Sequence, residues 1–354
     1  MGAPAESLAV LPAVARALSL AASAGHVCLP LTELQGSVWA QGEGAADSGQ
    51  GGGDGAGGDG AGGDVGVLRA RLLRSGLVAG EGQAAGRSSA HPMVLDAGDR
   101  LYLRRYFDLE CRLAAALAAR AQASTGQPVG DGVAPLLGSL FPPRDAAAGP
   151  DWQKLAVALA LNRRLTVISG GPGTGKTTTV AALLACLLQG DPALRVALAA
   201  PTGKAAARML EALRGRAAML PAALRARLPA EAHTVHRLLG VTSEPGRFRH
   251  TADNPLAVDV LVVDEASMLD LALATRLLDA LPADARLVLL GDKDQLAAVE
   301  AGAVFAELSA ARALTADTIG RLAALCDTPA AAIARAVAAG DAAAVADGGD
   351  SGAG

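Results

Sequence analysis

Aromatic residues make up only 2% of the 354-residue sequence, although hydrophobic residues make up 51%. A core with so few rings must be built mainly from Ala, Val and Leu. The cysteines, Cys28, Cys111, Cys186 and Cys326, are widely separated and include no C-x-x-C pair. This spacing favours free thiols in a reducing compartment over disulfides or a zinc site. The sequence also has no apolar run of membrane-spanning length and no basic N-terminal segment typical of a signal peptide. We therefore expect a cytoplasmic protein without a membrane partner.

Lysine is also scarce, with 4 residues against 27 arginines, and the net charge is −4. The net charge alone decides neither for nor against a nucleic-acid partner. Lysine provides a more compact point charge than arginine. All four lysines lie in or beside the motifs described below, namely Lys154, Lys176, Lys204 and Lys293.

Composition divides the chain into segments. Residues 1–125 are mainly helical in pattern and are interrupted at 42–64 by a Gly-rich acidic stretch, which we expect to be a disordered insertion. The Gly/Pro-rich range 126–150 is typical of an interdomain linker. A domain at 151–310 carries the motifs, and 311–354 is predicted to hold Ala-rich helices and a frayed tail.

The most informative stretch is a β-branched run at 165–169, followed by G-x-x-x-x-G-K-T and an apolar helix. Glycines allow successive backbone N–H groups to surround phosphate oxygens, and the following helix dipole adds positive potential. Lys176 can reach the β- and γ-phosphates, and the Thr177 hydroxyl can ligate Mg²⁺. The pattern predicts a site for ATP and Mg²⁺ formed by Gly170, Gly171, Pro172, Gly173, Thr174, Gly175, Lys176, Thr177 and Thr178.

Other candidate residues lie upstream and downstream of this loop. Gln153 opens the preceding helix and is either a surface glutamine or a reader of the adenine edge. Asp264 and Glu265 follow an apolar strand at 260–263. They either form a plain turn, or Asp264 holds Mg²⁺ while Glu265 orients or deprotonates the attacking water.

Further strands are predicted at 195–200 and 286–290. Gln295 follows the latter and is a candidate for sensing the γ-phosphate. The candidate functional residues follow the ends of the predicted strands, as in parallel α/β sheets. The predicted fold class is therefore α/β, with a parallel sheet flanked by helices.

Two stretches are candidates for DNA contact. Residues 203–230 are strongly basic and form either a solvated face or a surface for phosphates. The aromatic cluster at 101–107 could stack on bases, but its leucine spacing and the helix predicted from Glu110 favour packing or a protein interface.

Together, DWQK, GGPGTGKTTT, APTGKAAARM, HTVHRLLG, VVDEASMLD and GDKDQLAAVEAG resemble superfamily-one DNA helicases. They most resemble the RecD family, the α subunits of exodeoxyribonuclease V (RecBCD), and GHVCLPL and LYLRRYFDLE add to this resemblance. It implies a RecA-like P-loop motor domain after a small, mainly helical N-terminal domain. It also implies ATP-driven 5′→3′ movement on single-stranded DNA in the repair of double-stranded ends, with RecB-like and RecC-like partners.

The resemblance assigns adenine reading to Gln153, and catalytic roles to Lys176, Asp264, Glu265 and Gln295. It assigns DNA contact to Thr202, Lys204 and His236, and Arg208 lies in the same basic stretch.

Members of this class use a second motor domain, and no pattern after residue 310 matches one. The chain is therefore expected to be truncated after its first motor domain. Three alternatives remain open: an ATP-binding structural subunit without turnover, a relaxase-type helicase and a stand-alone helicase.

Overall fold

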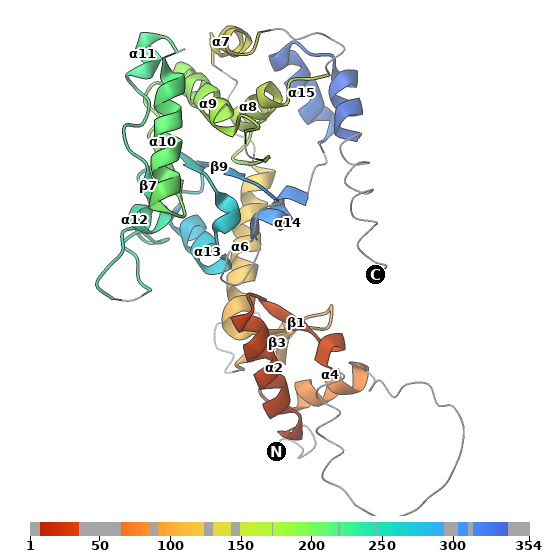
Figure 1. Ribbon diagram of the computed structural model, residues 1–354. Helices are drawn as coiled ribbons and strands as arrows, with labels where there is room; N and C mark the ends of the chain where they lie inside the picture. The colour runs from red at the N-terminus through yellow and green to blue at the C-terminus, as the bar shows by residue number, and fades with distance from the viewer. Residues whose placement is uncertain are drawn as a thin grey trace, which may run out of the picture. The chain divides into compact units, whose positions relative to one another are not determined.

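The computed structural model describes residues 8–34, 65–84, 91–123, 130–142, 149–171, 173–218, 220–244, 246–293, 304–310 and 314–338. The chain divides into two compact units (Figure 1). Unit 1 comprises the described residues up to Arg112 together with Asp270–Ala272, and unit 2 comprises the other described residues. The predicted insertion at 42–64 and the end of the predicted tail lie outside the described residues.

Unit 1 combines helices with a small four-stranded sheet of order β1-β4-β3-β2. The β2–β3 pair is parallel and the other two pairs are antiparallel. The strands are β1 (Cys28–Pro30), β2 (Val78–Gly80), β3 (Met93–Leu95) and β4 (Arg100–Leu103). The helices are α2 (Leu11–Ser23), α4 (Val65–Arg74), α5 (Glu81–Ala84) and the beginning of α6 (Arg104–Gln122).

Helix α2 shows why unit 1 folds with so few aromatic residues. Its buried residues Leu11, Val14 and Leu18 recur at helical spacing and face the core with residues of α4 and the sheet. Tyr102 is an exception to the aliphatic core, because it is buried and lies edge-on to Phe107 with ring centroids 5.4 Å apart. The aromatic cluster therefore packs within its own unit, as its leucine spacing favoured, and α6 begins at Arg104 rather than at the expected Glu110.

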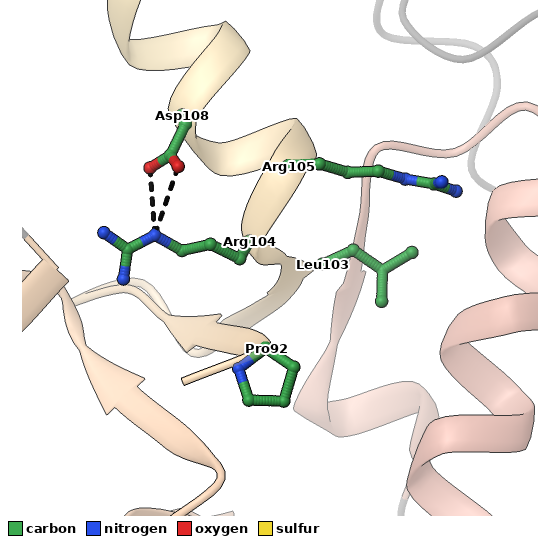
Figure 2. A pocket seen from close by; sticks show the side chains of 5 residues that line it. All are labelled: Pro92, Leu103, Arg104, Arg105 and Asp108. Atoms are coloured by element: carbon green, nitrogen blue, oxygen red, sulfur yellow. Dashed lines mark hydrogen bonds and ion pairs between the residues drawn. The ribbon is translucent and has the colours of Figure 1, made fainter. Parts of the chain in front are cut away.

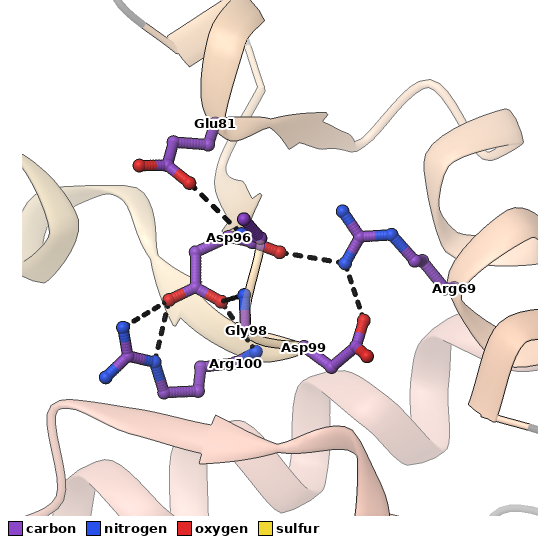
Figure 3. Close-up of polar contacts among 7 residues, drawn as sticks. Arg69, Glu81, Asp96, Gly98, Asp99 and Arg100 are labelled. Atoms are coloured by element: carbon purple, nitrogen blue, oxygen red, sulfur yellow. Dashed lines mark hydrogen bonds and ion pairs between the residues drawn. The ribbon is translucent and has the colours of Figure 1, made fainter.

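The turn between β3 and β4 is held by carboxylates (Figure 3). The buried Asp96 carboxylate accepts hydrogen bonds from the backbone N–H groups of Gly98 and Arg100, both at 2.9 Å, and from the Arg100 side chain at 2.7 Å. Arg69 of α4 donates to the Asp96 carbonyl at 2.8 Å and to the Asp99 carboxylate at 2.6 Å. These polar contacts attach α4 to the sheet beside the leucine core, which makes the network structural.

Unit 2 contains a five-stranded parallel sheet of order β5-β9-β8-β6-β7. Its strands are β5 (Leu165–Ser169), β6 (Val196–Ala200), β7 (His233–Thr234), β8 (Val260–Val263) and β9 (Arg286–Gly291). The four strands expected from the sequence are confirmed, with ends that differ by at most one residue. The short strand β7 was not expected.

Helices surround this sheet and carry the core of unit 2. They are the end of α6, α7 (Val133–Leu140), α8 (Trp152–Asn162), α9 (Lys176–Gly190), α10 (Gly203–Ala217), α11 (Ala222–Arg225), α12 (Val235–Leu239), α13 (Leu271–Ala280) except for its first two residues, α14 (Val304–Ala310) and α15 (Ala316–Cys326). Helix α9 is buried on nearly all sides, from Thr179 to Leu188. A helix that is apolar all round belongs inside a domain, so the P-loop precedes a helix packed within the core of the unit.

The range 126–150, expected to be a linker, contains α7. Val133 and Leu137 of α7 are buried in the core that also contains residues of α9. The Gly/Pro composition reflects the ends of this segment, whereas the apolar stretch between those ends folds onto unit 2. Downstream, Leu322, Cys326 and Ile333 of the Ala-rich segment also lie in this core.

The end of α6, which belongs to unit 2, is held by a buried arginine. The Arg120 guanidinium donates to the carbonyls of Leu281 at 2.8 Å, Pro282 at 2.9 Å and Ala285 at 3.0 Å. Burial lowers the pKa of Arg120, and these carbonyls satisfy its N–H groups. They belong to the turn that leads into β9, so the arginine fixes the start of that strand. No helix in the described part of the chain has the length and apolar character to cross a membrane.

Candidate nucleotide-binding site

The glycine positions of the loop between β5 and α9 are required by its backbone. Gly173 and Gly175 have φ values of +78° and +86°, in the left-handed region that side chains disfavour. A Cβ at Gly170 would lie 2.7 Å from the Thr174 hydroxyl oxygen, and one at Gly175 would lie 2.2 Å from the amide nitrogen of Gln153. The loop is therefore a tightly folded cradle, as the motif predicted. Pro172 lies outside the described residues.

The basic and hydroxyl residues of the motif stand on the first turn of α9. Lys176 is half-buried, and its ammonium group donates to the Gly170 carbonyl across the loop. Thr177 and Thr178 are half-buried beside it. The positive end of the helix dipole, the loop and the Lys176 charge thus lie together, an arrangement that attracts anions.

Gln153 lies in the first turn of α8 and contacts this loop. Asp151 caps that helix, because its carboxylate accepts from the backbone N–H of Gln153 at 3.0 Å and of Lys154 at 3.2 Å. The Gln153 amide then donates to the Thr174 carbonyl at 2.9 Å. The structure therefore brings Gln153 to the loop despite their separation in sequence.

A cavity of about 340 Å³ opens between α8, β5 and the loop. Its lining includes Trp152, Gln153, Ala156, Leu159, Thr166, Val167, Ile168, Ser169, Gly170, Thr174, Lys176 and Thr179. Apolar walls with a few convergent polar groups suit a purine base joined to phosphates. Sequence reasoning missed Trp152, which lines this cavity while 54% exposed. Its position beside Gln153, in a chain that has two tryptophans, could have indicated that it lies at the site.

Asp264 and Glu265 lie at the carboxyl end of β8, the same edge of the sheet at which β5 leads into the loop. Burial raises the pKa of Asp264, while the Lys176 charge and a hydrogen bond from the Glu265 N–H act in the opposite direction. The charge of Lys176 thus reaches Asp264, which makes the two residues parts of one electrostatic site.

Glu265 has an unusual backbone, with φ of +53° in the left-handed region. A non-glycine residue in that region carries strain that surrounding structure must support, and such residues cluster at functional sites. Its buried Oε2 atom has no hydrogen-bond partner within the described residues. A buried carboxylate oxygen without a partner fits a site that receives water or a metal-bound ligand.

Gln295 lies outside the described residues, so its predicted role stays a prediction. Strand β9, which precedes it, ends at the same sheet edge as β5 and β8.

The candidate DNA residues lie beyond β6 and β7, which are adjacent in the sheet. The Thr202 hydroxyl accepts from the Ala205 N–H at 3.2 Å and caps α10, so its observed contact is structural. Lys204 and Arg208 are exposed on α10. His236 is exposed on α12, with its ring centroid 5.9 Å from that of Phe248. The adjacent strand ends place Thr202 and His236 at one edge, but the four residues form no cluster comparable to the P-loop.

A larger cavity, of about 550 Å³, lies in unit 1 (Figure 2). It is lined by Pro92, Leu103, Arg104, Arg105 and Asp108. The Arg104 Nε donates to both Asp108 oxygens, at 3.1 and 3.2 Å, so these two side chains are paired with each other. The cavity lacks the backbone cradle of the β5–α9 loop, which makes the latter the better ligand site despite its smaller volume.

Comparisons with known proteins agree with this division. The family described as "RecBCD enzyme subunit RecD, N-terminal domain" matches residues 3–102, and the family described as "AAA domain" matches residues 153–301. RecD of Mycobacterium tuberculosis is 50% identical over 228 residues, which cover 62% of this chain and 38% of that protein. The chain is therefore similar to RecD proteins in its N-terminal domain and over the residues that it shares with this relative.

Other relatives show the same pattern. RecD of Haemophilus influenzae is 47% identical over 166 residues, covering 45% of this chain and 26% of that protein. The "ATP-dependent RecD2 DNA helicase" of Deinococcus radiodurans is 41% identical over 174 residues, covering 46% of this chain and 22% of the helicase. The chain thus spans about two-fifths or less of the length of these relatives. The AAA-domain match at residues 153–301 includes the P-loop and Gln153, which is consistent with a nucleotide site in this unit.

Proposed function

We propose that this chain binds Mg·ATP and serves as the ATP-driven 5′→3′ DNA helicase subunit of a RecBCD-type exodeoxyribonuclease V complex. Its substrates would be double-stranded DNA ends and the single strands exposed from them, and its partners RecB-like and RecC-like subunits in the cytoplasm. The observation that carries the proposal is the convergence of Lys176, Gln153 and Asp264 at one sheet edge, in a chain that also has a RecD N-terminal domain.

In this proposal the phosphates occupy the cradle from Gly170 to Thr178. Lys176 exchanges its present acceptor, the Gly170 carbonyl, for phosphate oxygens, because a charged acceptor binds an ammonium group more strongly than a neutral one. Gln153 recognises the adenine edge through its amide, and the apolar wall of the cavity covers the base.

The residues present fit Mg²⁺, since Asp264 is a carboxylate near the Lys176 charge and Thr177 offers a hydroxyl at the start of α9. When bound with ATP, Mg²⁺ supplies positive charge that neutralises the phosphate oxygens. Glu265 orients the attacking water and accepts its proton, a role that suits its partnerless buried oxygen. Gln295 senses the γ-phosphate in the same scheme.

Thr202, Lys204, Arg208 and His236 are proposed to contact the DNA backbone. Their elements leave the sheet at the edge where nucleotide binds, so a nucleotide-dependent movement there would reach the DNA contacts directly. The N-terminal domain is proposed to dock on the RecC-like partner. Its match to a RecBCD-subunit family favours this assembly over a stand-alone helicase of the RecD2 type.

The test uses the chain assembled with RecB-like and RecC-like subunits on duplex DNA with a 5′ overhang. We expect ATP-dependent unwinding from that overhang and DNA-stimulated hydrolysis, both abolished by Glu265→Gln. Arg335→Gln is the matched control, since Arg335 is exposed and donates only to Ala331 of its own helix among the described residues. ATP binding with no turnover under any DNA condition would instead favour the structural subunit.

A further inference from the structure

Helix α15 lies alongside α8, the helix that carries Gln153 (Figure 1). Two polar contacts join the pair at opposite ends. At the start of α8, the Lys154 ammonium donates to the Cys326 carbonyl at the end of α15, at 2.8 Å. Just beyond the end of α8, Arg163 donates to the Thr318 hydroxyl near the start of α15, at 2.6 Å. The two helices are therefore antiparallel and held at both ends.

The contact at Lys154 is favourable for a helix terminus. A cation beside the last carbonyls of a helix interacts well with the negative end of its dipole. The Cys326 thiol lies 3.9 Å from the Lys154 carbonyl, which makes the contact reciprocal. Cys326 and Leu322 are buried in the core shared with Leu155 of α8, so the polar contact stands at the edge of an apolar interface.

Lys154 is also the neighbour of Gln153 in the capped first turn of α8. The Asp151 carboxylate accepts from both backbone N–H groups, so the two residues are fixed by one cap. Successive residues of a helix point about 100° apart. Gln153 accordingly reaches the Thr174 carbonyl of the P-loop, while Lys154 reaches α15 on another side.

The fit of Gln153 against the P-loop tolerates little movement. A Cβ on Gly175 would lie only 2.2 Å from the Gln153 amide nitrogen, which shows how closely the amide rests on the loop. A shift of the first turn of α8 by a few tenths of an ångström would lengthen the 2.9 Å hydrogen bond and turn the amide from its present direction.

We propose that Lys154 is a positioning residue for base recognition: it fixes the first turn of α8 between α15 and the P-loop, so that Gln153 keeps the orientation that selects adenine. This inference rests on the proposed ATP site. It assigns the C-terminal helix α15 a part in nucleotide selectivity, although α15 does not line the cavity.

The experiment measures binding of sugar-labelled fluorescent ATP and GTP analogues, each with Mg²⁺, to the full chain. Lys154→Met keeps most of the aliphatic stem and removes the donor. We expect ATP affinity to fall about five- to tenfold, as for the loss of one ordinary hydrogen bond to the base, with GTP affinity unchanged. Lys154→Arg should retain most of the ATP preference, because a guanidinium can also donate to the Cys326 carbonyl.

Arg163→Met is the matched control, because it removes the donor at the other end of the same helix pair. A thermal unfolding midpoint should fall for both variants, but the ATP-to-GTP affinity ratio should fall only for Lys154→Met. An equal loss of both nucleotides with Lys154→Met, or a ratio that matches that of Arg163→Met, would overturn the positioning role.

Three further variants separate this inference from the proposed function. Lys176→Ala should weaken ATP and GTP alike, and failure to do so would remove the nucleotide site itself. Gln153→Ala should abolish the base preference, and adding Lys154→Met to it should cause no further decrease in the ratio. A further decrease in the double variant would show that Lys154 acts independently of Gln153 and would contradict the inference.

Discussion

The proposed ATP site and the basic face of α10 differ in how their residues are held. We define the basic face as Lys204, Arg208, Arg214 and Arg216, all exposed. At the ATP site, side chains contact the loop that they serve: Lys176 donates to Gly170, and Gln153 donates to Thr174. On the basic face the side chains extend into solvent, and Arg214 donates to the Ala230 carbonyl. A compact phosphate group requires convergent donors, whereas an extended polyanion requires only charge spread along its path.

The comparison therefore predicts that single substitutions in the ATP site have large effects, because each residue completes a geometry. Substitutions on the basic face should have small and additive effects, because each residue supplies one charge among several.

Replacement of Lys176 by Ala should cause the largest decrease in affinity. It removes a charged donor from a half-buried cradle, so Mg·ATP affinity should fall by about 2–3 kcal/mol, or about 30- to 150-fold. Equilibrium titration with a fluorescent ATP analogue measures this. Arg335→Ala, which removes an exposed cation from the C-terminal segment, should bind as the unmodified chain does. Equal affinity for the Lys176 variant would show that the loop is not the phosphate site.

Replacement of Gly175 by Ala should reduce stability and ATP binding together. The φ of +86° costs an alanine about 1–2 kcal/mol, and its Cβ would displace the Gln153 amide. Urea unfolding measures the decrease in stability, and adding Gln153→Ala should recover part of it. Gly215→Ala is the control, since Gly215 lies within α10 with no atom near its Cβ position, and should stabilise by about 0.5–1 kcal/mol. A Gly175 variant as stable as the unmodified chain would contradict the described loop backbone.

The metal requirement should depend on pH through Asp264. Burial raises the pKa of this carboxyl group above its ordinary value, so its protonated fraction grows as the pH falls toward that raised pKa. The Mg²⁺ concentration needed for half-maximal ATP binding should therefore increase as the solution becomes more acid. Asp264→Asn should need more Mg²⁺ at every pH and should lose this component of the pH dependence. Identical pH profiles for the two proteins would exclude Asp264 as the titrating ligand.

The same contrast explains which parts of the fold and of the site could be predicted from the sequence. The P-loop and the strands at 165–169 and 260–263 are local patterns in which residue type dictates backbone, so they were predicted at the correct positions. Strand β7 is two residues long and has no periodicity to read. The Gly/Pro-rich composition hid α7, whose role depends on packing against α9.

Contacts between segments that are distant in the sequence could not be predicted for a different reason. Lys154 and Cys326 are 172 residues apart, and neither residue type indicates the other. The motif DWQK suggested nucleotide chemistry for this turn but gave no sign that its lysine faces α15. Similarly, the charged residues of α10 predicted a basic surface. The role of Thr202 as the N-cap of that helix became clear only from the structure.

Substitutions on the basic face should have the smallest effect on affinity. Comparing two pairs of residues tests which part of this face binds DNA. If Lys204 and Arg208 bind phosphates, replacing both by Ala should weaken single-stranded DNA binding uniformly across sequences. It should also reduce the slope of log affinity against log salt by about 0.7–1 for each phosphate that is no longer neutralised. Arg214 and Arg216 lie toward the other end of α10 and carry the same charge, so their double replacement is the matched control. Because the proposed DNA path follows the carboxyl edge of β6 and β7, only the first pair should change the slope. Equal changes from both pairs would mean that α10 attracts DNA as a diffuse charge, and no change from either would make the face a solvated helix surface.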